Sequence, residues 1–220
     1  MKISPWKKAI SFLTPVRLWK GSSPVNPVLE LLLSSGRYQL ATVDALYSDG
    51  NRYRPLVAGL GEMRRQLSGV KSVLVLGAGL GSAVDVLRTF GARPEITLVE
   101  LDEVVARWGR ELLRSEDRDS VRFVVEDAQV FVQEGSDEYD LVIVDVFSGR
   151  EPLPFVTQPD FLRACKQRMA PGGMFLLNYM LNAGSAPWDE TLSRIETVFA
   201  GARVLAIGPN RVMIYPGFME

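Results

Sequence analysis

The chain has 220 residues, enough for one large domain with a small appendage. Hydrophobic residues make up 47% of it and charged residues 23%, and the formal net charge is −1. This balance is typical of a globular protein and argues against broad nucleic-acid binding, which needs a basic surface. No apolar run approaches the roughly 18 residues of a membrane span, so we expect no stable membrane insertion.

The numbers of cysteine and histidine residues exclude further kinds of site. Cys165 is the single cysteine, so an internal disulfide is excluded, and we expect a reducing, cytoplasmic location. The chain contains no histidine, which excludes a Ser-His-Asp triad and a histidine metal site. We therefore expect no metal, and a general base must be a carboxylate, a tyrosine, a lysine or water.

The first twenty residues form a basic segment that carries three large aromatic side chains, Trp6, Phe12 and Trp19. We expect an arm that packs these rings on the domain or on a second subunit; the alternative is an arm that lies on a membrane surface. Residues 21–50 then predict a small β segment, because short apolar runs are separated by turn residues at 34–36 and at 49–50.

A linking helix is expected from residue 53 to residue 67. Its apolar positions recur at helical spacing, at Leu56, Leu60, Met63 and Leu67. The main domain should follow this helix directly. We therefore divide the chain into residues 1–69, with the arm, the β segment and the linking helix, and residues 70–220.

Strands and helices alternate through the main domain. Strands are predicted at 73–76, 96–100, 121–125, 140–145, 174–180, 203–207 and 211–215, and helices at 80–90, 103–113, near 130, at 160–169 and at 188–200. This order predicts an α/β, Rossmann-like fold with a seven-stranded, mostly parallel sheet and an antiparallel C-terminal hairpin that turns at 209–210. The apolar, proline-rich loop 147–158 is either a lid or a contact with a neighbouring subunit.

A glycine turn and three acids mark the ends of four consecutive strands. In a parallel sheet these ends meet at one edge, where open α/β folds bind ligands. Glycines let the backbone turn tightly and approach a ligand, and the next helix N-terminus adds positive potential. The pattern predicts a nucleoside site built on Gly77, Gly79, Gly81, Glu100, Asp127 and Asp145.

Each acid has a simpler alternative. Glu100 can accept both ribose hydroxyls or be a solvated strand end, and Asp127 can accept the adenine amino group or merely cap a helix. A nicotinamide-dependent oxidoreductase is a further hypothesis. The dinucleotide fingerprint requires glycine or alanine at the place of Ser82, which opposes that hypothesis.

The runs VLVLGAGLG, TLVELDEVV, RFVVEDAQVFV, EYDLVIVDVFS and PGGMFLL resemble the spermidine synthase branch of the class I S-adenosylmethionine-dependent methyltransferase superfamily, the polyamine aminopropyltransferases. The family patterns are GGGDG, LVEIDP, GDGREFL, YDVIIVDSSDP and PGG. The resemblance implies that the co-substrate is S-adenosylmethionine or its decarboxylated form. It places Gly77, Ala78, Gly79 and Gly81 under the methionine-like tail, Glu100 and Leu101 at the ribose, and Asp127 and Ala128 at the adenine.

The resemblance also implies that Asp145 faces a small amine acceptor, orients it and receives its proton, with Tyr53 and Ser148 lining the acceptor site. It further implies a homodimer formed through the N-terminal β segment.

Three positions depart from the family pattern. Leu80 replaces the aspartate of GGGDG, Ser148 replaces the second aspartate of the DSSD-type motif, and Arg54 follows Tyr53 in place of histidine. Aminopropyl transfer, methyl transfer and a binding module without turnover therefore all stay open.

Overall fold

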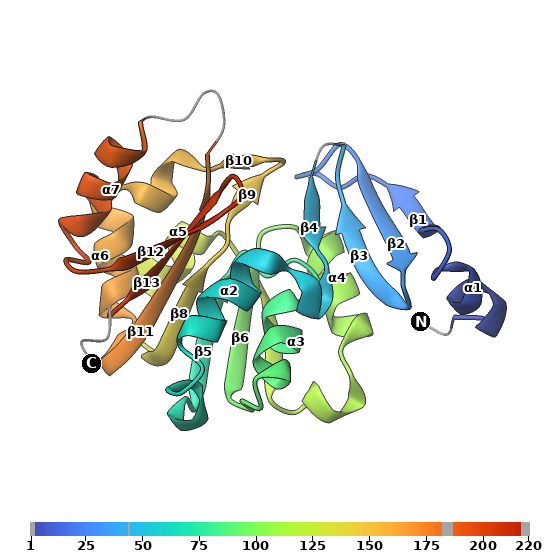
Figure 1. Ribbon diagram of the computed structural model, residues 1–220, viewed down its shortest axis with the longest axis horizontal. Helices are drawn as coiled ribbons and strands as arrows, with labels where there is room; N and C mark the ends of the chain where they lie inside the picture. Colours follow the sequence, from blue (N-terminus) through green and yellow to red (C-terminus); the bar gives the residue numbers. More distant parts are fainter. Residues whose placement is uncertain (1–2, 44, 182–186, 217–220) are drawn as a thin grey trace.

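The computed structural model describes residues 3–43, 45–181 and 187–216. The chain forms a large mixed sheet covered by helices, with a smaller sheet at its N-terminal side (Figure 1). The order of the seven-stranded sheet is β12-β13-β11-β8-β5-β6-β7. Its strands are β5 (Ser72–Leu76), β6 (Glu95–Glu100), β7 (Val121–Val125), β8 (Tyr139–Val144), β11 (Met169–Met180), β12 (Arg203–Ile207) and β13 (Asn210–Tyr215).

The predicted α/β fold is confirmed by the pairing of these strands. β5, β6, β7, β8 and β11 run parallel, and β13 is antiparallel to both of its neighbours, β11 and β12. From β5 the chain builds outward through β6 and β7, and then returns to place β8 on the other side of β5. This reversal of strand order is the switch point at which open α/β sheets bind ligands.

Both faces of the large sheet are buried, which explains its nearly continuous apolar strands. Val73 and Val75 face the cluster formed with α2 and α3, whereas Leu74 and Leu76 face the cluster formed with α5, α6 and α7. Alternate residues of a strand point to opposite faces, so one strand serves both cores. The helices are α2 (Arg54–Glu62), α3 (Ser82–Thr89), α4 (Glu103–Leu112), α5 (Ala128–Glu134), α6 (Pro159–Gln167) and α7 (Trp188–Glu196).

The N-terminal segment is a four-stranded antiparallel sheet preceded by a short helix. Between the second and third strands, Ser35 and Gly36 both have positive φ (50° and 75°), as the twist of a two-residue hairpin requires. The elements are α1 (Pro5–Ile10), β1 (Val16–Gly21), β2 (Leu29–Ser34), β3 (Arg37–Ala41) and β4 (Leu46–Ser48).

Part of the arm is a strand, which was not predicted. β1 pairs with β2, and its Trp19 packs on Trp108 of α4, with ring centroids 4.9 Å apart. Trp6 and Phe12 are instead 59% and 63% exposed. One aromatic ring of the arm therefore packs within the chain, and two face outward.

Two predicted boundaries also differ in detail. The C-terminal hairpin turns at Gly208-Pro209 rather than at 209–210, because Ile207 pairs with Asn210 and Gly208 adopts a φ of 60°. α7 ends at Glu196 rather than at residue 200.

The loop predicted at 147–158 folds into a small hairpin, with strands β9 (Phe147–Ser148) and β10 (Glu151–Pro152). A short 3₁₀ helix, Pro154–Thr157, follows it. Phe155 packs edge-on against Phe161 of α6, with centroids 4.9 Å apart. The base of the hairpin is thus anchored on its own chain.

Candidate functional site

A cleft of about 710 Å³ opens at the carboxyl ends of the central strands, between the N-terminal sheet and the β9–β10 hairpin. A cleft of this size can hold a nucleoside together with a second small molecule. Most of the predicted site residues line it, namely Tyr53, Gly77, Gly79, Glu100, Leu101, Asp127, Ala128, Asp145 and Ser148.

The glycine turn is shaped by the backbone of the neighbouring strand. Gly77 has a φ of 83°, and a Cβ atom there would collide with the carbonyl oxygen of Asp145. Gly79 has a φ of 53°. Ala78 and Gly81 lie behind the cleft: Ala78 is 6% exposed and packs in the core, and Gly81 precedes the first turn of α3. The turn brings backbone, without side chains, to the cleft wall.

Glu100, at the end of β6, is fixed by two backbone donors. The Gly79 N–H donates to Oε2 at 2.9 Å, and the Asp102 N–H donates to Oε1 at 3.0 Å. Burial raises the pKa of Glu100 to about 7, although the backbone hydrogen bonds oppose that rise. Each carboxylate oxygen keeps a second acceptor site, so the pair can accept two neighbouring hydroxyls.

Asp127 caps a helix and lines the cleft at the same time. Its Oδ1 accepts a hydrogen bond from the Gln129 N–H at 2.7 Å, at the N-terminus of α5. The next residue, Ala128, is 8% exposed and forms part of the cleft wall. Glu126, which was not predicted as a site residue, also lines the cleft. The capping alternative is thus observed, and it leaves Oδ2 available.

Asp145 sits in a network of neutral donors at the end of β8. The Tyr53 hydroxyl donates to its Oδ1 at 3.2 Å, and the Asn178 Nδ2 donates to the same oxygen at 2.7 Å. Asn210 in turn donates to the Asn178 Oδ1 at 2.8 Å. Burial raises the pKa of Asp145 to about 6, whereas its two hydrogen bonds lower it. The carboxylate is therefore charged at neutral pH and ready to accept a proton.

The other members of this network stay neutral. Burial, followed by the charge of Asp145, raises the pKa of Tyr53 well above its usual range. Asn178 and Asn210 come from β11 and β13, and neither was predicted as a site residue. Asn178 could have been found in the sequence, because it is a lone amide within an apolar run. Its side chain is 1% exposed. Such a buried polar side chain must have a partner.

The β9–β10 hairpin forms the outer wall of the cleft. Ser148 is exposed at its edge, and the Gly149 N–H donates to the Tyr47 hydroxyl of β4. Figure 1 shows the hairpin reaching from the large sheet toward the N-terminal sheet. This hydrogen bond joins two walls that come from distant parts of the chain.

Leu80 lies outside the cleft. It packs against Leu29, Leu40 and Val105, below the N-terminal sheet. The residue at the place of the family's GGGDG aspartate thus makes an apolar contact. Within residues 3–43, 45–181 and 187–216, no group of three or more acidic or cysteine side chains could hold a metal ion, and no helix is long and apolar enough to cross a membrane.

Sequence comparison identifies relatives of this chain. Residues 51–186, more than half of the chain, match the spermine/spermidine synthase domain. The chain is 29% identical over 125 residues to a polyamine aminopropyltransferase of Clostridium botulinum, and 32% identical over 112 residues to one of Pectobacterium carotovorum. The matches cover 55% and 48% of this chain, but only 42% and 39% of those proteins.

Solved structures show the same fold. A probable spermidine synthase from Corynebacterium glutamicum superimposes with a TM-score of 0.73 at 21% identity, covering 90% of this chain and 78% of that one. Spermidine synthase from Thermotoga maritima gives 0.68 at 18% identity, covering 90% and 71%. The fold, the motifs and the family match agree, and the chain belongs to the spermine/spermidine synthase domain family.

Proposed function

We propose that the protein is a transferase that moves an aminopropyl group from decarboxylated S-adenosylmethionine to a small amine. The observation that carries this proposal is the half-buried Asp145, held by neutral donors, in the same cleft as the glycine turn and Glu100. The polyamine aminopropyltransferases named among the relatives support the reaction type.

In this proposal the nucleoside end of the cleft is formed by β5, β6 and β7. Glu100 accepts the ribose hydroxyls, with Leu101 beside it, and Asp127 and Ala128 hold the adenine. The backbone at Gly77 and Gly79 lies against the tail of the donor, supported from behind by Ala78 and Gly81. The sulfonium of the donor then lies toward the end of β8.

The chemistry needs alignment and one proton acceptor. The neutral amine attacks the carbon next to the sulfonium, a C–N bond forms, the C–S bond breaks with its electrons going to sulfur, and methylthioadenosine leaves. The surplus proton on nitrogen passes to Asp145, whose raised pKa suits a general base. Fixing the two reactants in line contributes several kcal/mol. Tyr53 holds the carboxylate in place and lines the acceptor site together with Ser148.

Methyl transfer from S-adenosylmethionine is the second candidate. Leu80 favours it, because this position offers an apolar side chain where the resemblance puts the aspartate that meets the aminopropyl ammonium. The same residues would serve, and S-adenosylhomocysteine would leave instead. A binding module without turnover is the third candidate.

The deciding experiment supplies each donor with a panel of amines and identifies the nucleoside product by mass spectrometry. Methylthioadenosine supports aminopropyl transfer, and S-adenosylhomocysteine supports methyl transfer. Asp145→Asn serves as the matched variant and should bind donor in calorimetry while losing turnover. Full activity of this variant would defeat the role of Asp145. Binding without turnover by the wild type would leave a binding module. The homodimer and the cytoplasmic location stay predictions.

A further inference from the structure

The charges that line the cleft change from one end to the other. At the nucleoside end, Glu100, Glu126 and Asp127 are acidic. Beyond them the remaining acidic lining residues are Asp49 and Asp145, and three arginines also line the cleft: Arg52, Arg54 and Arg150. A diamine carries two positive charges, so a wall with three guanidinium groups disfavours it.

The three arginines have no partner in the described part of the chain. Their guanidinium groups take part in none of its hydrogen bonds or ion pairs, whereas other arginines are paired, such as Arg88 with Asp117 at 2.6 Å. Asp49 accepts instead from the Gln39 amide at 2.7 Å. The positive charge of the cleft is therefore not neutralised from within these residues.

Asp145 does not use this charge either. The groups that lower its pKa are the neutral side chains of Asn178 and Tyr53, and burial outweighs both. An arginine in contact with a carboxylate would lower the pKa strongly. The guanidinium groups thus remain available to a second anion.

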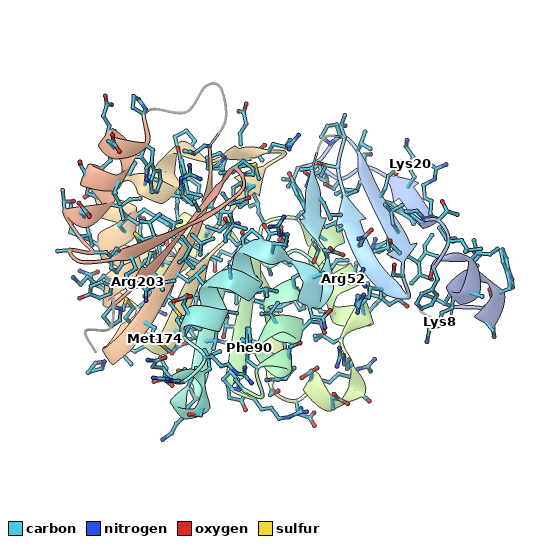
Figure 2. All side chains as sticks on the ribbon, viewed as in Figure 1. Lys8, Lys20, Arg52, Phe90, Met174 and Arg203 are labelled. Atoms are coloured by element: carbon cyan, nitrogen blue, oxygen red, sulfur yellow. The ribbon has the colours of Figure 1, made fainter. Side chains whose placement is uncertain are left out.

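Two segments of the chain bring these cations to the cleft. Arg52 and Arg54 flank Tyr53, whose hydroxyl touches Asp145. Figure 2 shows Arg52 where the chain passes from the N-terminal sheet into α2. Arg150 lies on the β9–β10 hairpin, next to Gly149 and its hydrogen bond to Tyr47. The cations thus come from both segments that frame the reacting end.

We propose that Arg52, Arg54 and Arg150 bind a carboxylate carried by one of the two substrates at the end of the cleft that contains Asp145. The inference rests on the proposed transferase function. The carboxylate has two sources. It belongs either to the acceptor, which is then an amino acid rather than a diamine, or to the methionyl part of an S-adenosylmethionine donor. Guanidinium groups suit both, because they bind carboxylates through paired N–H donors.

The test uses pairs of ligands that differ by a single carboxylate. These pairs are S-adenosylmethionine with its decarboxylated form, ornithine with putrescine, and lysine with cadaverine. Calorimetry measures the donors alone and the amines in the presence of methylthioadenosine. Single variants Arg52→Gln, Arg54→Gln and Arg150→Gln are compared with Arg163→Gln, a half-exposed arginine of α6 away from the cleft.

We expect the carboxylated member of at least one pair to bind more tightly than the other member. The cleft variants should lower the affinity for the carboxylated member roughly tenfold or more, and leave the affinity for the member without the carboxylate unchanged. An effect on S-adenosylmethionine assigns the carboxylate to the donor, and an effect on ornithine or lysine assigns it to the acceptor. Tighter binding of the decarboxylated member in every pair would overturn the proposal. Equal losses for both members of a pair would do the same.

The binding readout separates this inference from the proposed function. Preference for a carboxylated ligand without turnover supports the anion site and removes the transferase. Turnover with diamines alone, unaffected by the three variants, keeps the transferase and removes the anion site. If none of these ligands binds, both proposals fail.

Discussion

At Asp145 a single carboxylate oxygen accepts hydrogen bonds from Tyr53 and Asn178, at a half-buried strand end that lines the cleft. Burying a charge with neutral partners alone costs free energy, and this cost appears as the raised pKa. The residue is suited to taking up a proton, and it is a poor contributor to stability. Active sites commonly combine these two properties.

The first prediction concerns the stability of Asp145→Asn. In the folded protein the pKa of this carboxyl is about 6, above its usual 3.8. Between pH 3.8 and pH 6 the folded protein therefore binds the proton more tightly than the unfolded chain does. The contribution to stability is therefore greatest in acid and is lost as the pH rises through about 6. Thermal unfolding at pH 8 should show a higher melting temperature for the variant than for the wild type, corresponding to a free energy of unfolding larger by on the order of 2 kcal/mol. The difference should vanish near pH 4; a less stable variant at pH 8 would contradict the argument.

The second prediction concerns Tyr53→Phe, which removes one hydrogen bond to the Asp145 carboxylate. The loss of a donor to the charged form raises the pKa of Asp145 further, so the acidic limb of the pH–rate profile should move to higher pH. Turnover at pH 9 should change much less. Tyr179→Phe is the matched control, because Tyr179 is buried against Trp188, apart from this network. Identical profiles for the two variants would remove Tyr53 from its positioning role.

At the scale of an element, α2 shows how closely the linking helix sits on the large sheet. A Cβ atom on Gly59 would lie 2.5 Å from the Leu176 Cδ1 and 2.8 Å from the Val212 Cγ1, whereas on Gly61 it would lie 3.6 Å from Phe90. The first position faces a filled core, and the second is in ordinary van der Waals contact.

These distances predict opposite effects for two alanine substitutions in one helix. Gly59→Ala should destabilise the protein by about 1–3 kcal/mol, because it overpacks the core. Gly61→Ala should be neutral or stabilise it by up to about 1 kcal/mol, because alanine favours helix. Urea denaturation of both variants measures the difference. Equal effects would mean that α2 can shift on the sheet.

The elements that could be predicted are those whose signal is local. The strands before Gly77, Glu100 and Asp145 are apolar runs bounded by turns, and their order determines the sheet. β1 was missed because its basic residues, such as Lys20, gain a partner only when Glu30 of β2 lies opposite. Strand formation there depends on a contact that the local pattern does not contain.

The site was predictable to the same extent. Residues at strand ends follow from topology alone, so Glu100, Asp127 and Asp145 were found. The partners of Asp145 depend on register: Asn178 and Asn210 meet because β11 and β13 are antiparallel with a specific alignment. A change of register by one residue would turn these side chains to the other face.

At the scale of the whole molecule, Asp102 joins the N-terminal sheet to the large domain. Its Oδ2 accepts hydrogen bonds from the Ser23 hydroxyl and from the Asn26 amide, the latter at 2.7 Å. Its Oδ1 caps α4 through the Val104 N–H at 2.9 Å. One buried carboxylate thus contacts both the N-terminal sheet and the large domain. The division of the chain at residue 69 stays a proposal, and this contact offers a way to test it.

Asp102→Asn should loosen the N-terminal sheet selectively. Asparagine caps a helix as well as aspartate does, but its amide nitrogen cannot accept from Ser23 and Asn26. Hydrogen exchange should accelerate roughly tenfold in β2 and β3, corresponding to about 1.4 kcal/mol, and stay unchanged in β5 and β8. Asp127→Asn, the equivalent cap of α5, is the control. Uniform acceleration across both sheets would show that they unfold as one unit.

The pKa of Glu100 has a consequence for how the cleft exchanges protons with its surroundings. At a pKa of about 7, about half of the empty molecules carry a proton on this carboxyl at neutral pH. Ribose hydroxyls donate to the ionised form, so nucleoside binding must expel that proton into the buffer. Titrations at pH 7 in phosphate and in Tris should therefore give different apparent enthalpies, and affinity should rise from pH 6 to pH 8. Glu100→Gln should abolish both dependences.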